Sequence, residues 1–93
     1  MLFLCNVTIP SLEKAEPFLK GHGEFLNKNF DQGIFKLFGP YLPLGTGGYL
    51  IAEADSKEAL RNILAKDPLT AAGAYSNEIH EVKLGRISDS LKA

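Results

Sequence analysis

Four segments of the chain have residue patterns typical of β-strands. Residues 2–9 are almost continuously apolar, with Val, Ile, Thr and Phe, and predict a central strand that stops at Pro10. Residues 34–39, 49–54 and 75–84 predict three further strands, separated by turn-forming residues and by helical patterns. The sequence therefore predicts a sheet of four strands.

Between the first two strands, apolar residues recur at the 3.6-residue spacing of a helix. Ser11 is a suitable N-cap for a short first turn over residues 12–16. The main helix is predicted to begin at Pro17, as its first residue, and to run to about Asp31 before Gly33 ends it. Its inward stripe comprises Phe18, Leu19, Phe25, Leu26 and Phe30.

A second helix is predicted after the third strand. Asp55 occupies the cap position of a capping-box spacing that Glu58 completes. The apolar stripe that follows comprises Ala59, Leu60, Ile63 and Leu64. Asp67-Pro68 then ends the helix or starts a new turn, because the residue before a proline is disfavoured in the helical conformation.

The predicted element order is β-α-β-β-α-β, which is the order of an α+β ferredoxin-like fold with both helices on one face of the sheet. The first strand carries Leu2 and Leu4 on one face, and Phe3, Cys5, Val7 and Ile9 on the other. The second strand sets Phe35 and Leu37 against Ile34 and Phe38. In a sheet with one solvent-exposed face, apolar and polar residues would alternate more regularly along each strand. We therefore expect the free face to be buried against a second copy, in a two-fold homodimer.

Composition limits the size and the partners of the protein. With 93 residues the chain makes one domain, predicted over residues 1–85, and a polar tail over residues 86–93. Ten basic and eleven acidic residues give a net charge of −1, and no run of like charge forms a patch. This balance argues against binding nucleic acid, which requires clustered Lys and Arg, and against a membrane-surface role.

The single cysteine and the N-terminus indicate a cellular setting. Cys5 has no second cysteine for an internal disulfide and lies among core residues, so a structural thiol is favoured over a nucleophile. The chain has no basic segment followed by a long apolar stretch, and no run of eighteen apolar residues. We expect a soluble, cytoplasmic protein.

His22 places an ionisable imidazole within the inward stripe of the first helix. It lies four residues after Phe18 and three before Phe25, so it shares their face. The flanking glycines, Gly21 and Gly23, cost the helix about 1 kcal/mol each relative to alanine. Close approach of another backbone or of a ligand is one explanation for two such glycines.

These features together resemble the YciI-like (YCII-related) family of small dimeric α/β-barrel proteins over almost the whole chain. The resemblance rests on His22 with Phe25 and Leu26, Gly33 leading to Phe38-Gly39-Pro40, Gly47-Gly48, Ser56 with Glu58, and Asp67-Pro68. It implies ferredoxin-like units paired sheet to sheet, with a pocket between sheet and helices. The family is similar in fold to muconolactone isomerases and small-molecule monooxygenases. Its recurrent histidine and aspartate fall on His22 and Asp67.

The candidate site is an acid/base dyad of His22 and Asp67. A carboxylate beside an imidazole fixes its tautomer and stabilises the imidazolium. The two side chains can meet only if the two helices pack side by side. The structural alternative is that His22 is a core histidine bonded to a backbone carbonyl and that Asp67 only caps the turn at Pro68.

Further residues are candidates for binding a substrate. Gly39, Pro40 and Tyr41 follow the second strand, and Tyr41 could overhang the pocket or only cover apolar surface. Tyr75 and Ser76, at the start of the last strand, could supply hydroxyl groups, although a packing role for Tyr75 is equally well supported. The proline-rich connection at residues 40–45 departs from the family pattern, so the resemblance does not carry over a substrate class.

Neither a metal nor a cofactor is predicted. His22 and His80 are the only histidines, and no Cys/His cluster with metal-ligand spacing exists. His80, near Glu78 and Glu81, is expected in a solvated or interface position. Residues 45–48 could cradle an anion, but a hairpin-type turn is favoured because the lysine and helix of a phosphate loop are missing.

Three functions remain compatible with the sequence. The first is an enzyme that uses the dyad for isomerisation, elimination or hydrolysis of a small organic substrate. The second is a non-catalytic dimeric module that binds a small ligand in the same pocket. The third is a structural interaction domain without a ligand. The fold class does not decide among them.

Overall fold

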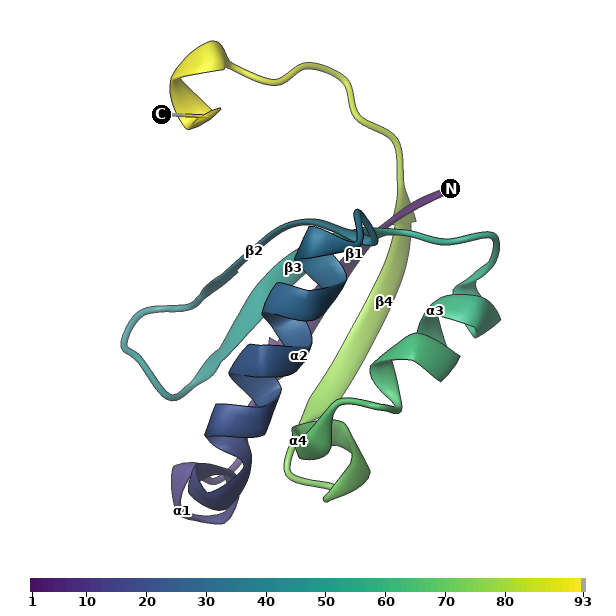
Figure 1. Cartoon of the computed structure of the whole chain (residues 1–93). Helices are drawn as coiled ribbons and strands as arrows, with labels where there is room; N and C mark the ends of the chain where they lie inside the picture. Colours follow the sequence, from purple (N-terminus) through teal and green to yellow (C-terminus); the bar gives the residue numbers. More distant parts are fainter. Residues whose placement is uncertain (93) are drawn as a thin grey trace.

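The computed structural model describes residues 1–92 and contains one antiparallel sheet of four strands in the order β2-β3-β1-β4 (Figure 1). Their bounds are Leu2–Thr8 (β1), Phe35–Pro40 (β2), Gly47–Glu53 (β3) and Ser76–Val82 (β4). Each predicted strand is present, with ends shifted by one to two residues. The strands and the main helices follow one another in the order β-α-β-β-α-β, as predicted for the ferredoxin-like arrangement.

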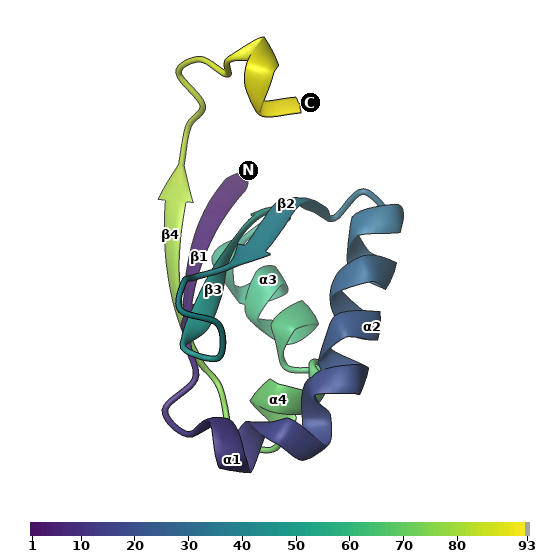
Figure 2. The ribbon, with the colours of Figure 1, turned by 90° about the vertical axis from the view of Figure 1, so that its left-hand side faces the viewer.

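Helices cover one face of this sheet. Their bounds are Leu12–Ala15 (α1), Glu16–Phe18 (η1), Leu19–Asp31 (α2), Lys57–Leu64 (α3), Pro68–Ala71 (α4) and Asp89–Lys92 (η2). Figure 2 shows α2, α3 and α4 on the same side of the sheet, whereas the other side carries no helix. Within residues 1–92, no helix is long and apolar enough to cross a membrane.

The start of the first helical segment differs from its prediction. Ser11 caps α1 as expected and accepts a hydrogen bond of 3.4 Å from the Lys14 amide. Pro17, however, lies inside the 3₁₀ turn η1, and the main helix begins at Leu19 instead of Pro17. Proline has no amide proton for an α-helical bond, so the chain makes a tighter turn before α2 starts.

The cap of the second helix also differs from its prediction. Ser56, not Asp55, is the N-cap of α3, and its hydroxyl accepts a 3.0 Å hydrogen bond from the Ala59 amide. Ser56 has the extended backbone that a cap requires, with φ −157°. The break predicted at Asp67-Pro68 is present, because α3 ends at Leu64 and α4 begins at Pro68.

The core lies between the sheet and the helices. Phe3, Cys5 and Val7 of β1 face it and are at most 1 % exposed, and they share one face of the strand, as its alternation predicts. In β2 the prediction was wrong, because Phe35 and Phe38 face the core together. A β-bulge between Phe35 and Leu37 shifts the register by one residue and so reverses the faces.

The inward stripe of α2 is narrower than predicted. Phe25 and Leu26 pack against the core cluster. Phe30 is 48 % exposed, although its ring contacts that of Phe38, and the buried residue of this last turn is Asn29. The Asn29 side-chain amide donates a 2.9 Å hydrogen bond to the Phe25 carbonyl, which satisfies the buried polar group.

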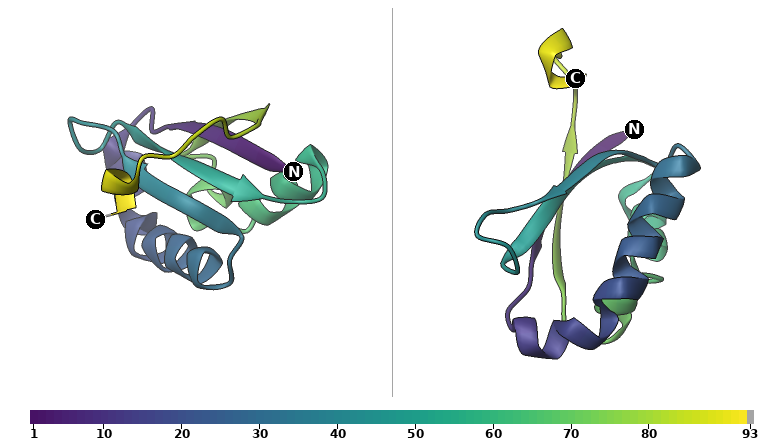
Figure 3. Two further views of the ribbon diagram at one scale, coloured as in Figure 1. Left: turned by 90° about the horizontal axis from the view of Figure 1, so that it is seen from above. Right: turned by 60° about the vertical axis from the view of Figure 1, so that its left-hand side comes forward.

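After β4 the chain leaves the sheet. Residues 83–91 are all exposed, and Figures 1 and 3 show this segment extending away from the other elements toward η2. The predicted boundary between a domain at 1–85 and a tail at 86–93 stays a prediction, and Ala93 lies outside the described residues.

Candidate functional site

The side chains of His22 and Asp67 are in contact, although they lie 45 residues apart in the chain. Nδ1 of His22, in the second turn of α2, is 2.8 Å from Oδ2 and 3.0 Å from Oδ1 of Asp67. Asp67 is the N-cap of α4, and its Oδ1 also accepts a 3.1 Å hydrogen bond from the Leu69 amide. The Asp67 carboxylate therefore binds the imidazole of His22 and also caps the N-terminus of the short helix α4.

Close packing of α2 against α4 makes this contact possible. Gly21 faces Pro68, and a Cβ atom at Gly21 would lie only 3.0 Å from Pro68 Cγ. Gly23 has open space around it, with no atom within 4 Å of the same position. The close approach at Gly21 is thus made by a proline side chain, where a backbone or a ligand was expected, and no close approach occurs at Gly23.

The geometry fixes the tautomer of the neutral His22 ring. A carboxylate only accepts hydrogen bonds, so the ring proton lies on Nδ1 and points at Asp67. Nε2 is then left as a hydrogen-bond acceptor. Asp67 is 1 % exposed, whereas the His22 side chain keeps 15 % of its accessible surface. The buried carboxylate orients the ring, and the ring is the member of the pair that reaches open space.

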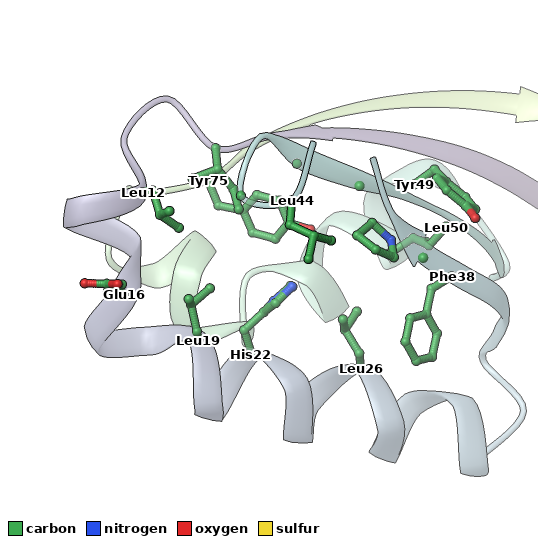
Figure 4. A pocket seen from close by; sticks show the side chains of 16 residues that line it. Leu12, Glu16, Leu19, His22, Leu26, Phe38, Leu44, Tyr49, Leu50 and Tyr75 are labelled. Carbon is green, nitrogen blue, oxygen red and sulfur yellow. The ribbon is translucent and has the colours of Figure 1, made fainter. Parts of the chain in front are cut away.

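That space is a pocket of about 440 Å³ between α2 and the sheet (Figure 4). His22 extends into it from α2, and the ring of Tyr75 approaches the imidazole edge to face, with centroids 5.0 Å apart. The other lining side chains are mostly apolar and include Ile9, Leu12, Leu19, Leu26, Phe38, Leu44 and Leu50. The arrangement suits a small organic ligand held against one imidazole.

Tyr75 keeps its hydroxyl proton to a higher pH than an ordinary tyrosine, because its pKa is raised. Burial raises the pKa of Tyr75 strongly, and the negative charges of Asp67 and of a Cys5 thiolate raise it further. The phenol is therefore a neutral group beside the imidazole, able to donate one hydrogen bond to a ligand and to accept another.

Of the residues predicted to bind substrate, Gly39, Pro40 and Tyr75 line the pocket, and Tyr41 and Ser76 do not. The Tyr41 hydroxyl donates a 2.7 Å hydrogen bond to Asn6 on the opposite face of the sheet. Ser76 is exposed and pairs with Thr8 on that same face. Side chains alternate along a strand, so a residue next to Tyr75 is directed away from the pocket.

Sequence reasoning missed several lining residues. Glu16 and Leu12 come from the short helical turns before α2, and Leu44 comes from the connection between β2 and β3. Leu44 is 72 % exposed and Leu12 44 %, so neither belongs to a periodic core pattern. Leu42 and Leu44 in the proline-rich connection were the available signal for a loop that contributes to a pocket, because two leucines are unusual in a fully solvated loop.

Residues 41–46 connect β2 to β3, so Gly45 and Thr46 lie in a hairpin connection, as the favoured interpretation predicted, whereas Gly47 and Gly48 already belong to β3. Gly47 has φ +145° and pairs with Thr8, and a Cβ atom there would collide with the Val7 carbonyl. Glycine is needed at this position because two backbones meet. Among residues 1–92, no group of three His, Cys, Asp or Glu side chains is placed to hold a metal ion.

His80 lies apart from the pocket. Its side chain is 56 % exposed on the helix-free face, and Nε2 is 2.7 Å from Oε1 of Glu78. The hydrogen bond from His80, followed by its positive charge, lowers the pKa of Glu78. This exposed position agrees with the expectation for His80.

Solved structures with the same fold include two named enzymes. The first is 5-chloro-2-hydroxyhydroquinone dehydrochlorinase from Burkholderia phenoliruptrix AC1100, in complex with 2,5-dihydroxybenzoquinone. It superposes with a TM-score of 0.77 and 27 % identity, over 91 % of this chain and 96 % of the neighbour. The second, a muconolactone isomerase, has a TM-score of 0.73 and 19 % identity, over 96 % and 95 %, which shows a shared fold.

Sequence comparison identifies the family. YjpA, an uncharacterised protein of Bacillus subtilis (strain 168), is 42 % identical over 64 residues, which are 69 % of this chain and 74 % of YjpA. The family description that matches residues 1–83 is that of the YCII-related domain. With the strand order, the pocket and these matches in agreement, the chain belongs to the YCII-related domain family.

Proposed function

We propose that this protein is a small-molecule enzyme in which His22 acts as the general acid or base and Asp67 orients it. The observation that carries the proposal is the two-oxygen contact of a buried carboxylate with Nδ1, which directs Nε2 toward the pocket. A positioned imidazole of this kind can transfer a proton to or from a substrate carbon or oxygen.

The reaction class follows from what the pocket contains. An imidazole can remove a proton from a substrate and return one, which serves isomerisation, elimination or hydrolysis without another catalytic group. Among these, elimination has the most direct support, because the neighbour that is 27 % identical is a dehydrochlorinase by name. Asp67 would stabilise the imidazolium that forms in each case.

The protein is further proposed to act as a homodimer, joined through the helix-free face of the sheet. Leu4 and Tyr49 on that face are 37 % and 38 % exposed. The polar groups beside them already have partners, since Tyr41 is bonded to Asn6 and His80 to Glu78. Hydrogen bonds already made within this face lower the cost of removing its polar groups from water, and a second copy would offer the same surface in two-fold symmetry.

The decisive experiment compares His22→Ala with His80→Ala, a change of the other histidine at an exposed site. Chloride release from 5-chloro-2-hydroxyhydroquinone is measured first, and the turnover of small lactones second. With a substrate that the parent converts, His22→Ala should lower kcat by about 10²-fold or more, while His80→Ala retains it.

Two outcomes contradict the proposal. Undiminished kcat in His22→Ala excludes an acid/base role for this residue. Saturable binding of these compounds without turnover in the parent favours the non-catalytic ligand-binding module, for which His22→Ala would change only the affinity.

A further inference from the structure

We propose that the pocket selects uncharged ligands that carry a hydroxyl group and rejects ligands that carry a carboxylate. This inference deepens the proposed function and rests on its assignment of the pocket as the ligand site. It concerns binding alone, and it follows from the charges and hydrogen-bonding groups around the pocket.

The pocket offers no cation to balance a negative ligand. Within the described residues, neither lysine nor arginine lines it, and the charged side chains at or behind its wall are acidic. Glu16 lines its outer end on η1, where Figure 4 shows the carboxylate directed away from the apolar lining side chains. Asp67 lies directly behind the His22 ring. A carboxylate ligand would therefore lose its hydration in an apolar space with two like charges nearby.

The imidazole determines which polar group a ligand must carry. Because Nδ1–H is directed to Asp67, Nε2 presents a lone pair and requires a donor. Tyr75, whose ring contacts the imidazole, contributes a neutral hydroxyl. A ligand hydroxyl can donate to Nε2 and accept from Tyr75, whereas a carboxylate can only accept and would leave Nε2 without a partner.

Three probes of similar shape separate these requirements. 4-Ethylphenol is neutral and donates, 4-ethylanisole is neutral and cannot donate, and 4-ethylbenzoate is negatively charged. Binding to the unmodified protein is followed by ¹H–¹⁵N NMR at about pH 8, where an ordinary imidazole and a phenol are both uncharged. We expect 4-ethylphenol to bind at least about tenfold more tightly than either of the others.

Two substitutions test the cause of the preference. Asp67→Asn removes the negative charge behind His22 and keeps a side chain that can cap α4. The ratio of the dissociation constants of 4-ethylbenzoate and 4-ethylphenol should therefore fall several-fold. Glu16→Gln should reduce it to a smaller extent, because Glu16 is exposed. The control is Glu13→Gln, a nearby exposed glutamate that does not line the pocket, and it should leave the ratio unchanged.

Each outcome decides the inference. It is overturned if 4-ethylbenzoate binds as tightly as 4-ethylphenol, if none of the probes binds, or if Asp67→Asn and Glu16→Gln both leave the ratio unaltered. Should Asp67→Asn fail to fold, the comparison of Glu16→Gln with Glu13→Gln decides it. The probes are not substrates, so these results are independent of the turnover of His22→Ala. If the protein binds 4-ethylphenol selectively but catalyses no reaction, the proposed enzymatic function is excluded and the proposed ligand class still holds.

Discussion

Gly21 in α2 lies directly against Pro68, the first residue of α4, so closely that a Cβ atom at Gly21 would require Pro68 to shift by a few tenths of an ångström. A methyl carbon there would lie 3.0 Å from Pro68 Cγ, closer than ordinary van der Waals contact. This approach places the neighbouring residues, His22 and Asp67, within hydrogen-bonding distance. The absence of a side chain at Gly21 thus lets α2 and α4 approach closely enough for His22 to contact Asp67.

The two glycines of α2 should respond in opposite ways to alanine. Gly23→Ala meets open space and should raise the free energy of unfolding by about 1 kcal/mol, the helix-propensity gain. Gly21→Ala gains the same propensity but presses on Pro68, so it should be less stable than Gly23→Ala by about 1 kcal/mol or more. Chemical denaturation measures both, and equal stabilisation would show that α4 moves aside freely.

The two histidines should hold opposite tautomers. His22 bonds through Nδ1 to Asp67, and His80 bonds through Nε2 to Glu78, so each neutral ring keeps its proton on the nitrogen that faces the carboxylate. Long-range ¹H–¹⁵N spectra of the neutral rings report the protonated nitrogen directly. In Asp67→Ala we expect His22 to lose its Nδ1–H preference and His80 to remain as it was. A His22 ring protonated on Nε2 in the parent would contradict the site geometry.

Cys5 should make stability fall at alkaline pH. Burial raises the pKa of the Cys5 thiol from its ordinary value near 9 to about 11. Between these values the unfolded chain releases the thiol proton and the folded chain retains it. The stabilisation is therefore complete below about pH 9 and declines by about 2–3 kcal/mol as the pH rises through 11.

The control for this prediction is Cys5→Ala, because tyrosines and lysines also titrate in the same range. Denaturation midpoints for both proteins, measured across the alkaline range, give the difference that belongs to the thiol. Parallel pH profiles for the parent and the variant would show that the buried thiol ionises as readily as an exposed one.

The sheet was predictable because its patterns are local. Alternation in residues 2–9 placed Phe3, Cys5 and Val7 together on one face, and in the structure that face is the one toward the core. The β-bulge in β2 was not predictable, since no glycine or proline lies between Phe35 and Leu37 to mark it. One unmarked residue of register shift was enough to exchange the two faces of that strand.

The candidate site depended on information that is not local. The inward position of His22 follows from helical spacing, but its contact with Asp67 requires α2 and α4 to meet. The sequence indicated this through the ferredoxin-like element order, which packs the helices side by side, and through a family resemblance. Glu16 and Leu44 lie in a 3₁₀ turn and a loop, where no periodicity relates a side chain to a pocket. Ser76 was predicted at the pocket together with Tyr75. Successive residues of a strand point to opposite faces, so Ser76 lies on the face away from the pocket.

The proposed dimer predicts that charge on the helix-free face dissociates the protein. Leu4 is central to that face, between Ile51 of β3 and His80 of β4. Leu4→Lys should convert the dimer to a monomer in sedimentation velocity, because two lysines related by the two-fold axis would be buried without partners. The control is Phe30→Lys, an exposed aromatic on the helix side, which should leave the oligomeric state unchanged. A parent that sediments as a monomer, or a Leu4→Lys variant that remains dimeric, would exclude this face as the interface.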